Sequence, residues 1–290
     1  SRVSYTEPLG QRGQMELEYQ IGNRLNDSDK LTFNVENGDF ESGNLSLDTA
    51  LSNTFQSKYL TQELEFGYQF LSEKLKVQTE LEYQDARLKN DQFFPNPDIL
   101  NKTFQNFTPT VRMEYKFSTN TNLQFDYDTY TNEPQISQLQ AVIDNTNPLQ
   151  LRTGNPDLDQ SYTNQIRFRF RSNNPDTDKN WNIFAQSRFV DNFISNSTLI
   201  ASEPTEIQDG IILETGSQLN KPVNLDGFKD FRSWFSYGMP LGFIKSNFNI
   251  NAGLGFTQRP GQVNDQIGFN NSSRLSTGFS LSSNISDQVD

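Results

Sequence analysis

The stretch Thr129–Arg171 reads TYTNEPQISQLQAVIDNTNPLQLRTGNPDLDQSYTNQIRFRFR, a long polar loop that runs into a strictly alternating strand. Successive side chains of a strand point to opposite faces, so this strand has one apolar face and one cationic face. The two faces consist of Ile166, Phe168 and Phe170 on one side and Arg167, Arg169 and Arg171 on the other. The sequence therefore predicts a strand that separates an apolar environment from an aqueous one.

The same alternation recurs along the whole chain, with large apolar side chains on one face and many charges on the other. The eleven alternating segments lie at 15–21, 31–35, 64–70, 75–83, 111–117, 123–127, 166–170, 181–189, 231–237, 248–256 and 275–281. A helical period of 3.6 residues is missing except for a short turn near 136–142. The expected fold class is all-β and antiparallel.

The predicted connections alternate between short turns and long loops, which is typical of an outer-membrane β-barrel. Short turns are expected near 22–30, 71–74, 118–122, 173–180 and 238–246. Long connections are expected at 37–62, 86–109, 129–163, 191–211 and 257–273. Aromatic residues gather beside the short turns, where one aromatic girdle of a barrel would lie.

The segment 211–237 keeps its alternation for longer than the roughly 9–11 residues that a strand needs to cross a bilayer. Either one strand projects beyond the membrane or two strands join near 224–227. Phe228 and Trp234 fall on the face opposite to the other apolar residues, which indicates a bulge or aromatic side chains that face the lumen.

The composition argues against several classes of function. Cys and His are both absent from the 290 residues, which removes thiolate sites, the commonest general base and the commonest metal ligand. A net charge of −12 disfavours nucleic acid as a partner. Asp176, Asp178 and Asn180 have the spacing that opens a calcium loop, but Trp181 and Ser187 stand where such a loop needs Gly and Glu. We therefore expect no catalytic residue, no metal, no cofactor and no enzymatic activity.

The central segment resembles the barrel signature of TonB-dependent receptors of the Bacteroidetes type. The resemblance is carried by PQISQLQ at 134–140, NPL at 147–149 and GNPDL at 154–158, and more diffusely by SYTEPLGQRGQMELEY at 4–19 and NLDGF at 224–228. It implies a 22-stranded barrel of the cell outer membrane, plugged by an N-terminal domain, that imports a scarce ligand with energy passed on by TonB.

Against that pattern, the chain lacks a plug domain, a TonB box and a closing C-terminal strand. Residues 1–290 are therefore expected to be one part of a single barrel domain, the middle portion, with about eleven or twelve of the 22 strands. The implied partners are outer-membrane lipid, the plug domain, TonB acting through that plug, and a surface lipoprotein as a further candidate.

Three groups of residues are candidates for ligand contact. Arg167, Arg169 and Arg171 suit a carboxylate or phosphate, although pairing with lumen acids such as Asp126 and Asp128, or with the plug, would be a structural alternative. Asn155 lies in the Asn-Pro-rich loop 145–158, which either contacts a ligand or caps the rim. Phe93 and Phe94, followed by Pro95 in a predicted loop at 89–107, either grip a ligand or pack within the loop.

Two other functions remain open at this point. The barrel could be a structural scaffold for partners in the outer membrane. The same alternation also suits a soluble β-rich binding module, with one face of its sheet on a core and the other in water.

Overall fold

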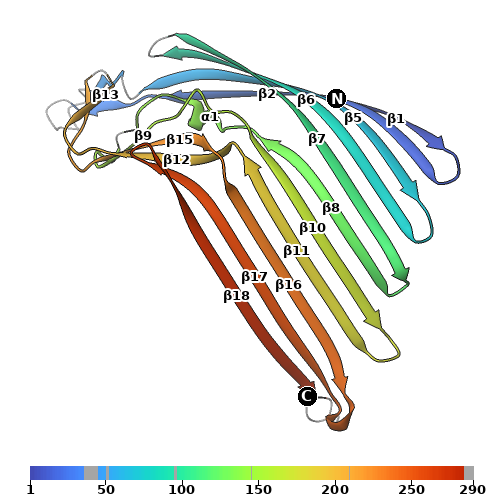
Figure 1. The fold of residues 1–290 in the computed structure, drawn as a ribbon. Coiled ribbons are helices and arrows are strands. Elements are labelled where there is room, and N and C mark those ends of the chain that lie inside the picture. The colour runs from blue at the N-terminus through green and yellow to red at the C-terminus, as the bar shows by residue number, and fades with distance from the viewer. Residues whose placement is uncertain (36–44, 50–51, 95–96, 145, 209, 284–290) are drawn as a thin grey trace.

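The computed structural model describes residues 1–290 except 36–44, 50–51, 95–96, 145, 209 and 284–290. Strands dominate this part of the chain (Figure 1). In chain order the elements are β1 (Arg2–Leu9), β2 (Gly13–Lys30), β3 (Phe33–Val35), β4 (Leu45–Leu47), β5 (Asn53–Leu71), β6 (Leu75–Phe94), β7 (Asp98–Ser118), β8 (Thr121–Asn132), α1 (Ile136–Leu139), β9 (Gln150–Arg152), β10 (Ser161–Asn174), β11 (Lys179–Asp191), β12 (Phe193–Ile200), β13 (Thr205–Gln208), β14 (Ile211–Leu213), β15 (Gln218–Leu225), β16 (Phe228–Leu241), the 3-10 turn η2 (Gly242–Ile244), β17 (Ser246–Val263) and β18 (Gln266–Ser283). No helix among the described residues is long and apolar enough to cross a membrane.

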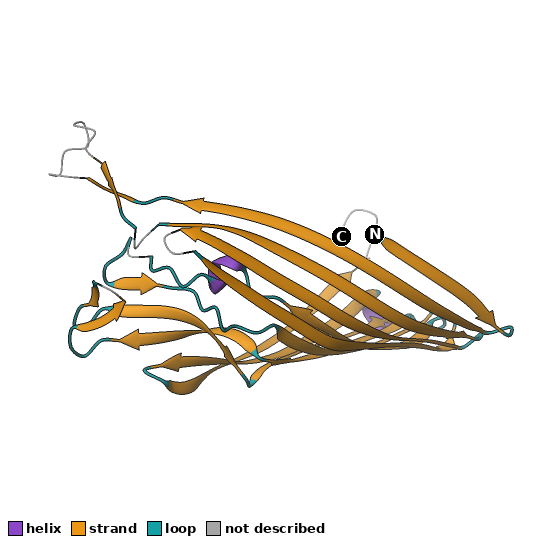
Figure 2. Cartoon of the chain, turned by 90° about the horizontal axis from the view of Figure 1, so that it is seen from above, coloured by secondary structure: helices purple, strands orange, loops and turns teal. Residues whose placement is uncertain are grey.

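The long strands form one antiparallel sheet in the order β1-β2-β5-β6-β7-β8-β10-β11-β16-β17-β18. Neighbours in the chain are neighbours in space, and the sheet curves into a trough (Figures 1 and 2). In the described residues β1 pairs only with β2, and β18 pairs only with β17. The predicted all-β antiparallel fold is confirmed.

The inner face of the trough is the charged face, and the outer face is the apolar one. Arg167 lies directly opposite Asp126 of β8, and directly opposite residues share a face. On the outer face, Phe66, Phe168 and Leu254 are all exposed. A soluble sheet would cover such a face with a core, whereas the two hydrophobic clusters found among the described residues involve loops and strand extensions. The outer face therefore fits contact with lipid.

A second layer lies at the end of the trough where the long connections are. Strand β12 pairs with β15, β15 pairs in parallel with β9, and β12 joins the end of β17 through Ser197 and Gln262. Figure 1 shows these strands together with α1 beside the upper part of the wall. The end with the second layer is called the long-loop end below, and the opposite end the short-turn end.

Several predicted features are confirmed. Helix α1 falls within the expected turn at 136–142, and the connection between β8 and β10 is long. Two strands, β15 and β16, meet at Gly227, whose φ of 99° is in the region that favours glycine. The hairpin at 175–178 is held by Asn174, whose Oδ1 accepts the N–H of Asp176 at 2.9 Å. A polar turn thus accounts for the aspartates there.

The aromatic cluster beside the short turns is also present. Trp181 and Tyr237 have ring centroids 4.1 Å apart, and Tyr115 and Phe117 have centroids 4.8 Å apart. All four residues lie near the short-turn end of the sheet.

Three predicted connections are wrong, because the strands are longer than their apolar stripes. The expected turn at 22–30 is the second half of β2, which stays paired with β5 as far as Lys30 and Asn53. The expected loops at 86–109 and 257–273 are mostly strand, since β6 reaches Phe94 and β17 reaches Val263. Beyond the apolar stripe the inner face carries apolar residues such as Tyr59 and Phe104, so the alternation of the stripe is lost while backbone pairing continues.

The connection at 37–62 is also shorter than expected, because β5 begins at Asn53. Much of the remainder, 36–44 and 50–51, lies outside the described residues. The segment 31–35 belongs to the small β3–β4 pair instead of the main sheet, while β1 was not predicted.

Candidate functional site

The connection at 133–160, called the inner loop here, folds back onto the charged face of the wall. Leu139 and Leu158 of this loop are buried, and both belong to a hydrophobic cluster with Tyr59 on β5 and Phe104 on β7. Lys102 of β7 donates a hydrogen bond to the carbonyl of Leu158 at 2.6 Å. The loop is therefore packed inside the trough and does not stand away from its rim.

On its other side, the inner loop is bonded to the second layer. Asn155 is 8% exposed, and its Nδ2 donates to the carbonyl of Pro222 on β15 at 2.9 Å. The N–H of Asp159 donates to Oδ1 of Asn224 at 2.8 Å, and Nδ2 of Asn224 returns a bond to the carbonyl of Asp159 at 3.1 Å. The inner loop thus links the wall formed by β5–β7 to the second layer.

The structure explains the first two residues of the GNPDL motif at 154–158. A Cβ atom on Gly154 would lie 2.1 Å from the carbonyl oxygen of Gln140, which leaves no room for a side chain. The N–H of Gly154 donates to that same carbonyl at 2.7 Å. Oδ1 of Asn155 accepts the N–H of Asp157 at 3.1 Å, which shapes the turn at Pro156. The Asn155 amide is therefore engaged by the backbone on both sides.

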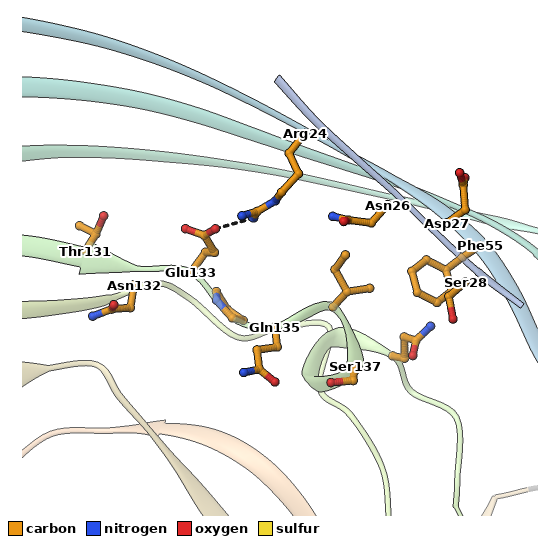
Figure 3. Close-up of a pocket in the computed structure, with 13 residues that line it drawn as sticks. Arg24, Asn26, Asp27, Ser28, Phe55, Thr131, Asn132, Glu133, Gln135 and Ser137 are labelled. Carbon is orange, nitrogen blue, oxygen red and sulfur yellow. Dashed lines mark hydrogen bonds and ion pairs between the residues drawn. The ribbon is translucent and has the colours of Figure 1, made fainter. Parts of the chain in front are cut away.

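A cleft of about 680 Å³ lies between the start of the inner loop and the extended parts of β2 and β5 (Figure 3). Most of its lining is polar, as in Asn26, Ser137 and Gln140. Arg24 and Glu133 point toward each other beside the cleft and form an ion pair of 2.5 Å. The Arg24 guanidinium also lies 5.2 Å from the ring centroid of Tyr59. This cleft can hold a polar ligand between the wall and the loop.

A backbone hydrogen bond lowers the pKa of one acidic residue of the inner loop. Asp144 accepts the N–H of Thr146 at 3.1 Å, and this bond holds the pKa of Asp144 below its usual value. Backbone bonds to Arg152 in both directions join the two arms of the loop at this point. Asp144 is therefore a structural anion of the loop at neutral pH.

The arginines of β10 differ in their surroundings. Arg167 pairs with Asp128 at 2.5 Å, so the expected structural pairing holds for this arginine. Asp126 is instead bonded to Arg112 of β7 at 3.0 Å. Arg169 lies 5.8 Å from the ring centroid of Phe184, and within the described residues neither Arg169 nor Arg171 has a carboxylate at ion-pair distance. Two of the three guanidinium groups are thus without an acidic partner there.

Acidic side chains collect on the N-terminal part of the wall. Glu18, Glu65 and Glu82 lie directly opposite one another on β2, β5 and β6. Glu18 contacts Arg2, and Glu82 accepts the hydroxyl of Thr108 at 3.1 Å. The described residues contain no group of three or more acidic residues arranged to hold a metal ion. The inner face therefore has an acidic side and an arginine-rich side.

Phe93 and Phe94 lie at the end of strand β6, so the predicted loop around them is wrong. Phe93 is exposed, and among the described residues neither phenylalanine is part of a hydrophobic cluster. Pro95 lies outside the described residues. The structure does not bring these phenylalanines together with the arginines of β10 on one surface.

The prediction missed other residues of the inner face, namely Tyr59, Phe184 and Leu158. Strand parity would have placed Phe184, which lies four residues from Arg188 on the same strand, whereas Tyr59 lies in the segment 37–62 that was expected to be a loop. Leu158 could have been found from the recurrence of leucine and isoleucine in an otherwise polar loop.

The comparison with protein families decides the class of the protein. The profile of the outer membrane protein beta-barrel family matches residues 1–289. The chain belongs to this family. This outer-membrane barrel protein therefore resides in the outer membrane, a location that disagrees with the alternative of a soluble binding module.

Several solved structures are similar to the outer-membrane barrel protein, among them an iron transporter and a hemophore receptor. The FrpB iron transporter from Neisseria meningitidis is 7% identical with a TM-score of 0.50, and the match covers 92% of this chain and 35% of FrpB. The Serratia marcescens hemophore receptor HasR, in complex with its hemophore HasA and heme, is 11% identical with a TM-score of 0.52, covering 96% of this chain and 48% of HasR. The chain thus spans less than half the length of either protein, and the likeness concerns the fold.

A search of the curated protein sequences finds no match to this outer-membrane barrel protein. FrpB is described as a transporter and HasR as a receptor.

Proposed function

We propose that this chain is part of the barrel of a TonB-dependent receptor that takes up a ligand across the outer membrane. The observation that carries the proposal is the inner loop, which lies within the trough and borders a polar cleft of about 680 Å³. A loop inside the lumen is in a position to contact a solute that enters from outside. The resemblance of the segments around 134–140 and 154–158 to the receptor signature supports the same function.

The sheet supplies part of the barrel in this proposal, roughly half of 22 strands. An open sheet edge cannot satisfy its backbone groups in lipid, so the free edges of β1 and β18 must both be paired in the membrane. The partial coverage of FrpB and HasR agrees with a larger barrel. A plug domain, TonB acting through it and a surface lipoprotein are the proposed partners.

Ligand contacts are proposed at two places on the inner side. The first is the arginine side of the wall, at Arg167, Arg169 and Arg171, where the last two have no acidic partner among the described residues. The second is the inner loop around Asn155. Phe93 and Phe94 stay candidates for contact with a ligand at the long-loop end, where Phe93 is exposed.

The proposal is tested by uptake in cells that carry the intact gene, the deleted gene, or the intact gene with a protonophore that removes the energy supply. Depletion of solutes from a defined medium is followed by mass spectrometry. We expect at least one solute to disappear only with the intact gene and without the protonophore. Identical depletion in all three cultures would favour a barrel that acts as a structural scaffold.

A further inference from the structure

Two large aromatic side chains lie on the charged inner face, among polar neighbours. The register places Arg169 opposite Phe184, Phe184 opposite Trp234, and Trp234 opposite Gly253, across β10, β11, β16 and β17. Residues directly opposite each other share a face, so these side chains form one row on the inside of the trough. Trp234 is 45% exposed. An exposed tryptophan on a mostly polar face is available to contact a ligand.

The indole of Trp234 lies against a floor of small residues. A Cβ atom on Gly253 would be 3.0 Å from Cε3 and 3.4 Å from Cζ3 of the Trp234 ring. It would also be 2.6 Å from Oγ of Ser276, the next residue of the row. A side chain at 253 would therefore push the indole away from the wall. Phe184 and Trp234 together are called the aromatic shelf.

Arginines frame the aromatic shelf on both sides. Arg169 and Arg171 lie on β10, while Arg232 of β16 and Arg274 of β18 lie opposite the same glycine, Gly255. Arg232 pairs with Asp230 at 3.1 Å. In the described part of the chain, Arg169, Arg171 and Arg274 have no carboxylate at ion-pair distance. The frame therefore carries positive charge that the described wall does not neutralise.

A pocket of about 340 Å³ opens between the shelf and the arginines of β10. Its lining includes Arg169, Arg171, Phe184 and Trp234, together with Asn182. This volume lies at the small end of the range for ligand pockets, so it suits one or two rings and not an extended molecule. Aromatic faces stack on other rings, and guanidinium forks bind carboxylate or phosphate.

We propose that the aromatic shelf and its arginine frame bind an anionic ligand that carries a planar aromatic ring, such as an aromatic carboxylate. The ring stacks on Trp234, and its acid group is held by Arg169 and Arg171. The acidic side of the wall, with Glu18, Glu65 and Glu82, repels the same ligand and confines it to the arginine side. The inference rests on the proposed uptake function and names its substrate class.

The test uses the intact gene product in bilayer nanodiscs, with benzene-1,3,5-tricarboxylate as the probe. Binding is measured by equilibrium dialysis and by the indole emission. We expect saturable binding with a change in emission that Trp234→Phe removes and Trp181→Phe preserves, because Trp181 lies on the outer face. Cyclohexane-1,3,5-tricarboxylate, with the same charges and no aromatic ring, is expected to bind at least tenfold more weakly.

A second set of variants tests the frame. Arg169→Ala combined with Arg171→Ala is expected to weaken binding at least tenfold, because the acid group of the ligand loses both of its guanidinium partners. Arg12→Ala, which removes a charge at the first short turn, is expected to have no effect. If the alanine pair does not insert, the lysine pair at the same positions keeps the charge and loses the fork, and intermediate affinity is expected.

Three outcomes would overturn the inference: no saturable binding, equal binding of the two tricarboxylates, or unchanged affinity in the arginine variants. Because dialysis does not require transport, binding without uptake would contradict only the uptake function. Uptake of a solute without an acid group or ring would contradict only the shelf.

Discussion

At the residue scale, neighbouring side chains of β10 face different solvents. Phe168 is 37% exposed on the outer face, opposite Phe125 and Ala185. Arg169, the next residue, lies on the inner face beside the ring of Phe184. A change of polarity is therefore expected to have opposite consequences at the two positions.

Phe168→Arg is expected to lower the stability of the barrel in a bilayer by about 2–4 kcal/mol, because a charge near the bilayer midplane on the lipid face is costly. Arg169→Ala is expected to cost much less, since it removes only one aqueous cation and its contact with an aromatic ring. Urea titration of protein folded into liposomes measures both values. Similar losses at the two positions would contradict the assignment of faces.

The sequence predicted which side chains of β10 point to each face, but it predicted the ion-pair partners of the arginines only in part. Asp126 and Asp128 were both candidate partners for these arginines, and each pairs with an arginine from a different strand. Asp128 accepts Arg167 of β10, whereas Asp126 accepts Arg112 of β7. Which arginine pairs with which aspartate depends on how the side chains lean across three neighbouring strands. Alternation along one strand carries no information about this.

At the element scale, the inner loop depends on a few buried polar contacts. The chain contains two Asn-Pro steps in this region, at 147–148 and 155–156. Asn155 is buried and joins the loop to β15, whereas Oδ1 of Asn147 accepts the N–H of Leu149 within an exposed turn. The pair offers a matched comparison within one loop.

Asn155→Ala is expected to destabilise the inner loop by about 1–3 kcal/mol, because the carbonyl of Pro222 and the N–H of Asp157 lose their partner. Asn147→Ala is expected to change stability by less than about 0.5 kcal/mol, as is usual for exposed positions. Amide hydrogen exchange of residues 150–160 reports the difference. Equal protection in both variants would show that the loop is held by its apolar contacts alone.

The sequence predicted the elements of the trough better than their lengths. The segment 64–70 marked only part of β5, which runs from Asn53 to Leu71. The apolar stripe ends where the lipid ends, whereas backbone pairing continues, so the stripe is shorter than a strand that projects beyond the membrane. The position of the inner loop was also missed, because its leucines lack the period of any regular element.

At the scale of the whole molecule, the apolar face of the trough is turned outward. Large side chains such as Phe66, Leu254 and Phe279 are exposed there, while the two hydrophobic clusters involve the inner loop and the second layer. The fold therefore depends on a surrounding apolar solvent, in agreement with the location in the outer membrane.

The protein is expected to require detergent or lipid to fold. Circular dichroism should show a β-sheet signal with a cooperative thermal transition in micelles, and the same chain diluted into plain buffer should aggregate, because its exposed apolar patches associate. Light scattering serves as the control for aggregation. A monomeric, cooperatively folded chain in water would contradict the membrane assignment.

The inner loop also has a consequence for the order of assembly. Each hairpin of the sheet joins segments that are close in the chain, so its loop-closure entropy is small. Leu158, in contrast, meets Tyr59 and Phe104, and Asn155 meets Pro222, so the loop needs partners from both halves of the chain. These contacts can form only after β5–β7 and β15 are in place. Docking of the inner loop is therefore a late step in folding, and it reports that the wall is complete.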